Sequence, residues 1–216
     1  TIMGVMLSTL HQAALGGLFL LAPGKLHPLW YSPLLPLFFL VSSTFVGLAM
    51  VIVECSLSHK FFHKICDPKS AKNLPNLVFG LGKAASLVMF VYFGLRVMGL
   101  MHADAMDQLS NQWGHWYLLE MLGFVLFPCM LFLYAATVRS LSLTRLAAVI
   151  AVAVVVLNRV NVSIIAFNYQ STVRYFPAWT EFAITIAIVT AGVVAFRWAV
   201  NRMPILYEHP DFNSEH

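Results

Sequence analysis

The chain alternates long apolar runs with short polar connections. Each apolar run is close to the roughly 20 residues that a helix needs to cross a bilayer. The runs cover residues 1–21, 34–56, 78–101, 115–138, 143–166 and 180–203. No internal repeat or soluble domain separates them. The pattern predicts an all-α fold, a polytopic transmembrane helix bundle with about six membrane-spanning helices, forming one transmembrane domain over residues 1–216.

Composition excludes a soluble globular domain. The chain is 60% hydrophobic and 10% charged, whereas soluble domains carry about 25% charged residues. Its net charge of +4 does not indicate nucleic-acid binding, because basic residues in membrane proteins usually set orientation. The three cysteines show no CxxC spacing, so the sequence supports neither a metal site nor a disulfide framework.

Lysine and arginine alternate between rich and poor connections. Residues 57–77 carry four lysines and residues 139–145 carry two arginines. Residues 102–114 carry none and residues 167–179 carry one. The positive-inside rule therefore predicts that the rich connections and the C-terminus face the cytoplasm. The poor connections face outside, together with residues 22–33, whose single lysine is an exception.

Aromatic residues gather at the predicted outer helix ends, as in an interfacial belt. They are Trp30, Tyr31, Trp113, Trp116, Tyr117, Tyr175 and Trp179.

Six polar side chains lie in the outer halves of the predicted spans. Charges inside a bilayer are costly, so the two acids and two arginines among them are expected to form at least one ion pair between spans. Two interpretations stay open: a structural girdle that ties four helices together, or a partly hydrated polar pocket that handles protons or a headgroup. The six are Arg96, Glu120, Asn158, Arg159, Asn161 and Glu181.

Four further positions are candidates. Glu54 and Lys83 lie nearer the cytoplasm on adjacent spans, either as a proton-path group or as a snorkelling pair. His11 is the one histidine well inside a span and lies beside Gln12; an imidazole can bind a quinone carbonyl, or simply bond to a neighbouring helix.

The segment GKLHPLW, residues 24–30, interrupts two apolar runs. Its His27 and Trp30 suit contact with a partner subunit, or only an interfacial anchor and a turn.

A haem held between helices needs paired deep histidines. Because only His11 lies deep in a predicted span, we expect residues 1–216 to hold no haem.

Five blocks of sequence resemble one known family. They are STLHQAALGGLFLLAPGKLHPLWYSPLLPLFFLVSSTFVGLAMVIVE (8–54), YFGLRV (92–97), WYLLEMLGFVLFPCMLF (116–132), LNRVNVSIIAFN (157–168) and YFPAWTEFAITI (175–186). These resemble the integral membrane subunits of the NrfD, or polysulfide reductase, family, and most closely its HybB-like branch found with nickel–iron hydrogenases. The match implies that this chain is the C-terminal portion of a larger subunit.

The resemblance also implies a function. Such subunits sit in the bacterial cytoplasmic (inner) membrane and are not catalytic alone. They pass electrons between an outer iron–sulfur (or cytochrome) subunit and the pool of menaquinone or ubiquinone. They hold no haem of their own, and they partner the catalytic subunits of a hydrogenase-like oxidoreductase.

The family's functional positions carry over residue by residue. Quinone contacts are expected at His11 and Gln12, with His27 and Trp30 near the mouth of the site. A polar or proton route is expected along Glu54, Arg96, Glu120, Asn158, Arg159, Asn161 and Glu181. A purely structural anchor and an ion- or proton-translocating module remain the alternatives.

Overall fold

The computed structural model describes residues 2–61, 68–103, 105–167, 169–171 and 177–202. These fall into two compact units, residues 1–172 and residues 173–216, and each unit is treated by itself.

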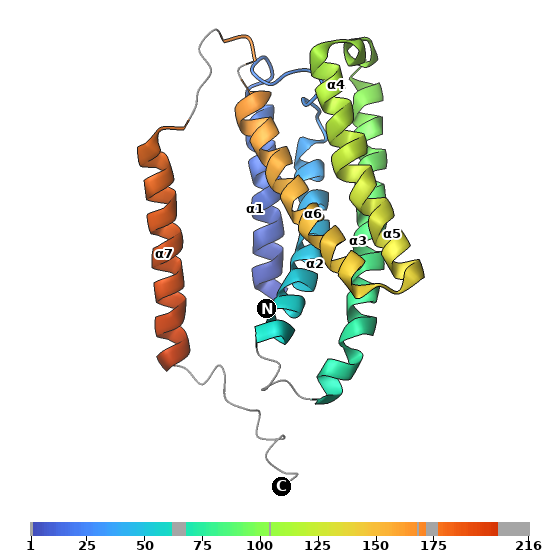
Figure 1. Ribbon diagram of the computed structural model, residues 1–216. Coiled ribbons are helices and arrows are strands. Elements are labelled where there is room, and N and C mark those ends of the chain that lie inside the picture. The colour runs from blue at the N-terminus through green and yellow to red at the C-terminus, as the bar shows by residue number, and fades with distance from the viewer. Residues whose placement is uncertain (1, 62–67, 104, 168, 172–176, 203–216) are drawn as a thin grey trace. The chain divides into compact units, whose positions relative to one another are not determined.

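The first unit is a helical bundle (Figure 1). Its elements are α1 (Ile2–Leu20), α2 (Leu35–Phe61), α3 (Pro68–His102), the 3₁₀ helix η1 (Met106–Ser110), α4 (Gln112–Leu118), the π-helix η2 (Leu119–Leu126), α5 (Phe127–Val138), α6 (Leu141–Val160) and the π-helix η3 (Asn161–Ile165). The part of the chain that the structure describes contains no β-strand, so the all-α prediction is confirmed.

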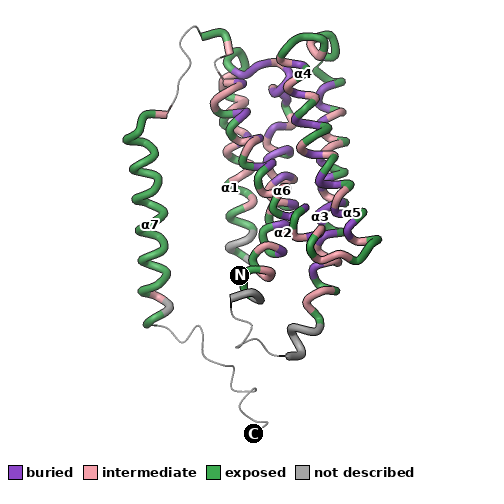
Figure 2. Tube along the Cα trace, viewed as in Figure 1, coloured by how far each residue is buried: buried purple, intermediate pink, exposed green. Residues whose placement is uncertain are grey.

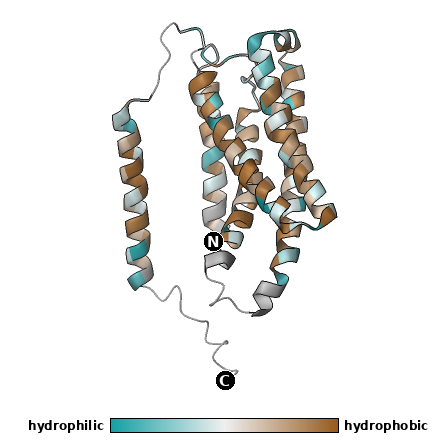
Figure 3. Ribbon diagram, in the orientation of Figure 1, coloured by the Kyte–Doolittle hydropathy of each residue, from teal (hydrophilic) through white to brown (hydrophobic). Residues whose placement is uncertain are grey.

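Five helical stretches are long and apolar enough to cross a membrane. They are Leu35–Ser58, Asn73–His102, Gln112–Val138, Leu141–Ile165 and Trp179–Ala199. The apolar part of α1, Met6–Leu20, is shorter. Figure 3, in which the ribbon is coloured by hydropathy, shows hydrophobic residues along much of each helix. These stretches correspond to the six predicted runs, and the chain is a multi-pass membrane protein.

The second unit contains α7 (Trp179–Arg202). Its residues are exposed along almost the whole described helix, as the colouring of Figure 2 shows. The exposed residues include many large apolar ones, which suits a helix surrounded by lipid or by other membrane helices.

Helix α2 lies at the centre of the first unit and packs against α1, α3 and α6. Helix α5 completes the bundle by packing against both α3 and α6. Small residues allow close approach where helices cross. A Cβ on Gly16 of α1 would lie 2.8 Å from the carbonyl oxygen of Leu35, so the backbones of α1 and α2 almost touch there.

The connection from α5 to α6 is a tight turn with local signals at both ends. Arg139 ends α5 in the left-handed conformation, with φ of 52°. Ser140 then caps α6, its side chain accepting the backbone N–H of Leu143. The turn places α5 and α6 side by side and antiparallel.

The connection between α1 and α2 is held down over one end of the bundle. The backbone N–H of His27 donates to the carbonyl of Ala166 at 3.0 Å, and Leu26 forms an isolated antiparallel bridge with Phe167. These bonds tie the loop to the chain that follows η3. The loop therefore closes the end of the bundle at which Glu120 lies.

Candidate functional site

The carboxylate of Glu120 is the centre of a buried polar network. Its side chain is only 2% exposed, and both of its oxygens accept hydrogen bonds. Oε2 accepts from Trp30 Nε1 at 2.9 Å and from Asn161 Nδ2 at 3.0 Å. Oε1 accepts from Arg96 Nη2 at 3.3 Å and from the side-chain amide of Asn158. The network thus joins the loop before α2, helix α3, η2, α6 and η3 at one point.

Two π-helical segments place these groups. Glu120 is the second residue of η2, and Asn161 is the first residue of η3. A π-turn widens the helix by one residue and is often found at functional sites. Asn158 and Asn161 are three residues apart and share one helix face, so each can donate to a different carboxylate oxygen.

Arg96 supplies the positive charge that balances Glu120. The guanidinium is 3% exposed and forms an ion pair with the carboxylate at 3.3 Å. Three aromatic rings surround it: its Cζ lies 5.5 Å from the ring centre of Phe38, 6.0 Å from Tyr92 and 5.1 Å from Tyr117. The faces of these rings stabilise a cation, which offsets part of the cost of burying it.

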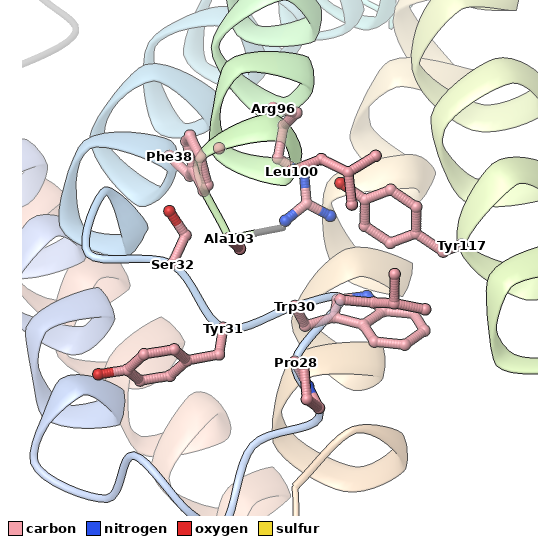
Figure 4. Close-up of a pocket in the computed structure, with 11 residues that line it drawn as sticks. Pro28, Trp30, Tyr31, Ser32, Phe38, Arg96, Leu100, Ala103 and Tyr117 are labelled. Carbon is pink, nitrogen blue, oxygen red and sulfur yellow. The ribbon is translucent and has the colours of Figure 1, made fainter. Parts of the chain in front are cut away.

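A small cavity lies beside Arg96, between the loop and the end of α3 (Figure 4). Figure 4 shows the guanidinium pointing toward the indole of Trp30, with Tyr117 on one side and Phe38 on the other. The cavity measures about 10 Å³, close to the space of one water molecule. Arg96 lines this cavity, and among the described groups its Nε has no hydrogen-bond partner.

Arg159 lies next to the network but has a different environment. Its Nη2 donates to Ser42 Oγ at 2.8 Å and to the carbonyl of Phe39 at 3.4 Å, and its Nη1 donates to Asn158 Oδ1 at 3.3 Å. Its Cζ lies 3.6 Å above the ring centre of Phe39. All of these partners are neutral.

His27 is enclosed by aromatic rings in the loop above the network. Its ring centre is 4.7 Å from that of Tyr169, 5.1 Å from Trp113 and 5.6 Å from Trp30. Its Nδ1 accepts the backbone N–H of Leu29 at 3.3 Å. Burial disfavours the charged imidazolium, so it lowers the pKa of His27 below its usual value. A neutral imidazole is also the form in which Nδ1 can accept this bond.

The chemistry of the network follows from its donors. Each of the four side chains that bond to Glu120 donates an N–H group to one of its two oxygens. The arrangement therefore joins several helices through one carboxylate. Among the described groups, Asn161 Oδ1 is a buried acceptor that has no partner.

Four of the residues predicted in the outer polar layer meet at this site. Arg96, Glu120, Asn158 and Asn161 are in direct contact, and Arg159 adjoins them through Asn158. The prediction of at least one ion pair between different spans is confirmed by Arg96 and Glu120.

Two aromatic residues contradict the prediction of an interfacial belt. Trp30 is 0% exposed and Tyr117 is 2% exposed, so neither faces a lipid headgroup layer. The physical reason is that each has a buried partner: the indole of Trp30 donates to Glu120, and the ring of Tyr117 packs on Arg96. Trp30 therefore cannot be the aromatic anchor that the loop offers to a partner or to lipid. Tyr175 lies outside the described residues.

Other predicted positions lie away from the network. His11 is exposed halfway along α1 and Gln12 is partly exposed beside it. Glu54 and Lys83 are both exposed, and no ion pair joins these two described side chains. Glu181 belongs to α7 in the second unit.

Sequence reasoning did not select the aromatic shell of Arg96. Tyr92 precedes Arg96 by four residues and Tyr117 precedes Glu120 by three, so each shares a helix face with the charge that follows it. This spacing was the available signal. Phe38 comes from another helix, and no local pattern pointed to it.

Comparisons with known proteins give related proteins but no solved structure. A family model described as polysulphide reductase, NrfD, matches residues 1–174. A curated protein of Nitratidesulfovibrio vulgaris strain Hildenborough is 49% identical over 220 residues, which cover 100% of this chain and 56% of that protein. The probable Ni/Fe-hydrogenase 2 b-type cytochrome subunit of Escherichia coli K12 is 28% identical over 207 residues, covering 94% of this chain and 51% of that protein.

The chain therefore spans about half the length of the curated relatives it matches. No solved structure matches it.

Proposed function

The chain belongs to the polysulphide reductase (NrfD) family, and we propose that it is part of a membrane subunit that exchanges electrons with quinone in a respiratory redox complex. The relative from E. coli is named as a probable subunit of a Ni/Fe-hydrogenase, which supports a hydrogenase or a similar oxidoreductase as the partner. We place the subunit in the bacterial cytoplasmic membrane with the C-terminus in the cytoplasm.

The exposed imidazole of His11 carries the quinone part of the proposal. It projects from the middle of an apolar helix, where an unbonded polar group is costly. Quinones dissolve in the same apolar layer, and their carbonyl oxygens accept hydrogen bonds. Together, His11 and Gln12 would bind one carbonyl oxygen of the quinone. Reduction of the quinone to quinol takes two electrons from the partner subunit and two protons.

The end of the bundle that holds Glu120 is the proposed docking face for an iron–sulfur or cytochrome subunit. The network fixes the loop before α2 against three helices, so this face is rigid. Lys25 is exposed in that loop and suits a polar contact, whereas Trp30 is buried and is reassigned to holding the loop. We propose that residues 1–216 bind no haem, because electrons pass directly between the redox centre of the partner subunit and quinone.

A second candidate function is a purely structural anchor. One observation favours it: the carboxylate of Glu120 accepts hydrogen bonds from four side chains. Such a network is suited to holding helices together. In that case the quinone chemistry belongs to another part of the full-length protein.

The test compares two electron acceptors in the full-length protein purified with its redox partner. The partner's activity with a soluble dye reports the intact catalytic subunits, and quinone reduction reports the membrane subunit. His11→Leu should lower the quinone-linked rate about tenfold, the effect of losing roughly 1.4 kcal/mol of binding, and leave the dye rate unchanged. Thr137→Leu is the control, because Thr137 is an exposed polar residue near the end of α5, at the opposite end of the bundle from the proposed docking face.

The outcomes separate the candidates. If His11→Leu retains the full quinone rate, the assignment of the quinone to α1 fails. If, in addition, a photoreactive quinone labels none of residues 2–61, the structural anchor is the better description of this segment.

A further inference from the structure

The described charges of the polar layer do not cancel within the first unit. Arg96 is neutralised by Glu120, but no described carboxylate of residues 2–171 contacts Arg159. Its acceptors are a hydroxyl, a backbone carbonyl and an amide oxygen, and its flat face lies on Phe39. The site thus has one positive charge more than it has negative charge.

An unbalanced cation in a membrane span is costly, and neutral acceptors compensate for only part of its lost hydration. A guanidinium has five N–H groups, of which three hydrogen bonds are accounted for. The remaining two, on Nε and Nη1, have no described acceptor, and each can donate a single hydrogen bond to an oxyanion. The side chain is also partly exposed, so an external group can reach it.

The surroundings of Arg159 indicate where such a group comes from. Val156 and Val160, its neighbours on the surface of α6, are exposed and apolar. The approach therefore passes over a surface that suits acyl chains rather than water or a charged protein loop.

Arg159 lies close to one end of its membrane-spanning helix. The apolar span Leu141–Ile165 has 25 residues and is about 37 Å long, several Å longer than a hydrocarbon layer of about 30 Å. Arg159 lies about 9 Å from the Ile165 end. Ser42, which accepts its shortest hydrogen bond, lies seven residues from Leu35 at the start of α2, or about 10 Å along that helix, so the guanidinium is held near the same depth.

We propose that Arg159, oriented by Ser42 and Phe39, binds the phosphate of an anionic phospholipid at the edge of the bundle. The lipid supplies the negative charge that the described part of the first unit lacks, and its acyl chains lie along the apolar surface of α6. The site is separate from the quinone contact proposed at His11.

The test uses the full-length protein, purified in a neutral detergent and titrated with three probes. Phosphatidylglycerol carries a net negative charge, phosphatidylcholine carries a phosphate cancelled by choline, and glycerol phosphate has no acyl chains. Native mass spectrometry gives the bound lipid, and thermal unfolding gives the stabilisation. We expect phosphatidylglycerol to bind and to raise the unfolding temperature, phosphatidylcholine to bind more weakly, and glycerol phosphate to have no effect.

Arg159→Gln should weaken the binding of phosphatidylglycerol about tenfold or more, because a charge-assisted hydrogen bond is lost. Lys83→Gln is the matched control: it removes one exposed positive charge from α3 and should leave the affinity unchanged. Ser42→Ala is a milder variant that frees the guanidinium from its shortest bond and should alter the affinity several-fold in a folded protein. It decides the test if Arg159→Gln does not fold.

Three results would overturn the proposal. Wild-type protein that binds no phosphatidylglycerol would indicate that a carboxylate of the protein itself neutralises Arg159. Equal binding by wild type and Arg159→Gln would place the lipid elsewhere, and stabilisation by glycerol phosphate alone would indicate a site for soluble phosphate.

Discussion

Glu120 illustrates how one residue can determine the environment of several others. Its carboxylate accepts from Trp30, Arg96, Asn158 and Asn161, which come from three separate parts of the chain. In a low-dielectric interior such bonds are strong when complete and costly when one partner is missing. The polar network is therefore stable as a whole and sensitive to the loss of its central group.

Replacing Glu120 with alanine is expected to lower the free energy of unfolding by about 3–5 kcal/mol, because Arg96 would stay buried without its counter-ion. Denaturant unfolding of the detergent-solubilised protein measures this. Glu54→Ala is the control; Glu54 is exposed, so its removal should change the free energy by no more than about 0.5 kcal/mol. Removing Arg96 as well should restore part of the stability, and a double variant as unstable as the two separate losses combined would contradict the pairing.

Helices in this bundle meet through small residues and through irregular turns. Gly16 lets α1 approach the start of α2, while the π-helices η2 and η3 place Glu120 and Asn161 opposite each other. A π-turn holds one residue more than an α-turn, so it changes by about 100° how the residues before it face relative to those after it. The irregular elements are thus where the polar network is made.

Gly16→Ala should destabilise the packing of α1 on α2. The added Cβ would lie 2.8 Å from the Leu35 carbonyl oxygen and 2.9 Å from the Cα of Pro36, and both are backbone atoms that cannot turn aside. Overpacking of this kind costs about 1–3 kcal/mol.

Gly17→Ala provides the matched control on the same helix. Nothing lies within 4 Å of a Cβ at Gly17, so alanine should be neutral or stabilise the helix by up to about 1 kcal/mol. Thermal unfolding of both variants gives the comparison, and equal melting temperatures would show that the close contact does not limit stability.

At the scale of the whole molecule, the chain combines an apolar exterior with a polar network inside one end of the bundle. Large apolar side chains are exposed along the helices, as expected where lipid is the solvent. The hydrogen-bonded residues of the network are up to 90 positions apart in sequence, as for Trp30 and Glu120. Stability at this end therefore depends on the complete bundle rather than on any one span.

The orientation of the molecule gives a prediction at the same scale. Because the connections at 57–77 and 139–145 carry most of the loop lysines and arginines, a tag placed after His216 should be accessible from the cytoplasm. A cysteine introduced at Gly24, in the opposite set of connections, should react with an impermeant reagent added outside intact cells. A tag accessible only from outside would invert the assignment.

The sequence by itself determined the class of the fold and the content of its polar layer. The long apolar runs predicted the membrane-spanning helices, since span length and composition are local properties. Charges are rare in these runs, and a charge at membrane depth needs a partner. Arg96, Glu120 and Arg159 were therefore identified from the sequence as candidates for the polar layer.

Only the tertiary structure decided which groups meet. Helical periodicity shows which side chains share a face, but it does not identify the group across the interface. Trp30 therefore looked like an interfacial anchor, and only its contact with Glu120 across the bundle showed it to be part of the core. In the same way, Arg96 and Arg159 are alike as sequence. The packing of η2 against α3 gives Arg96 a carboxylate, whereas the packing of α2 against α6 gives Arg159 neutral acceptors.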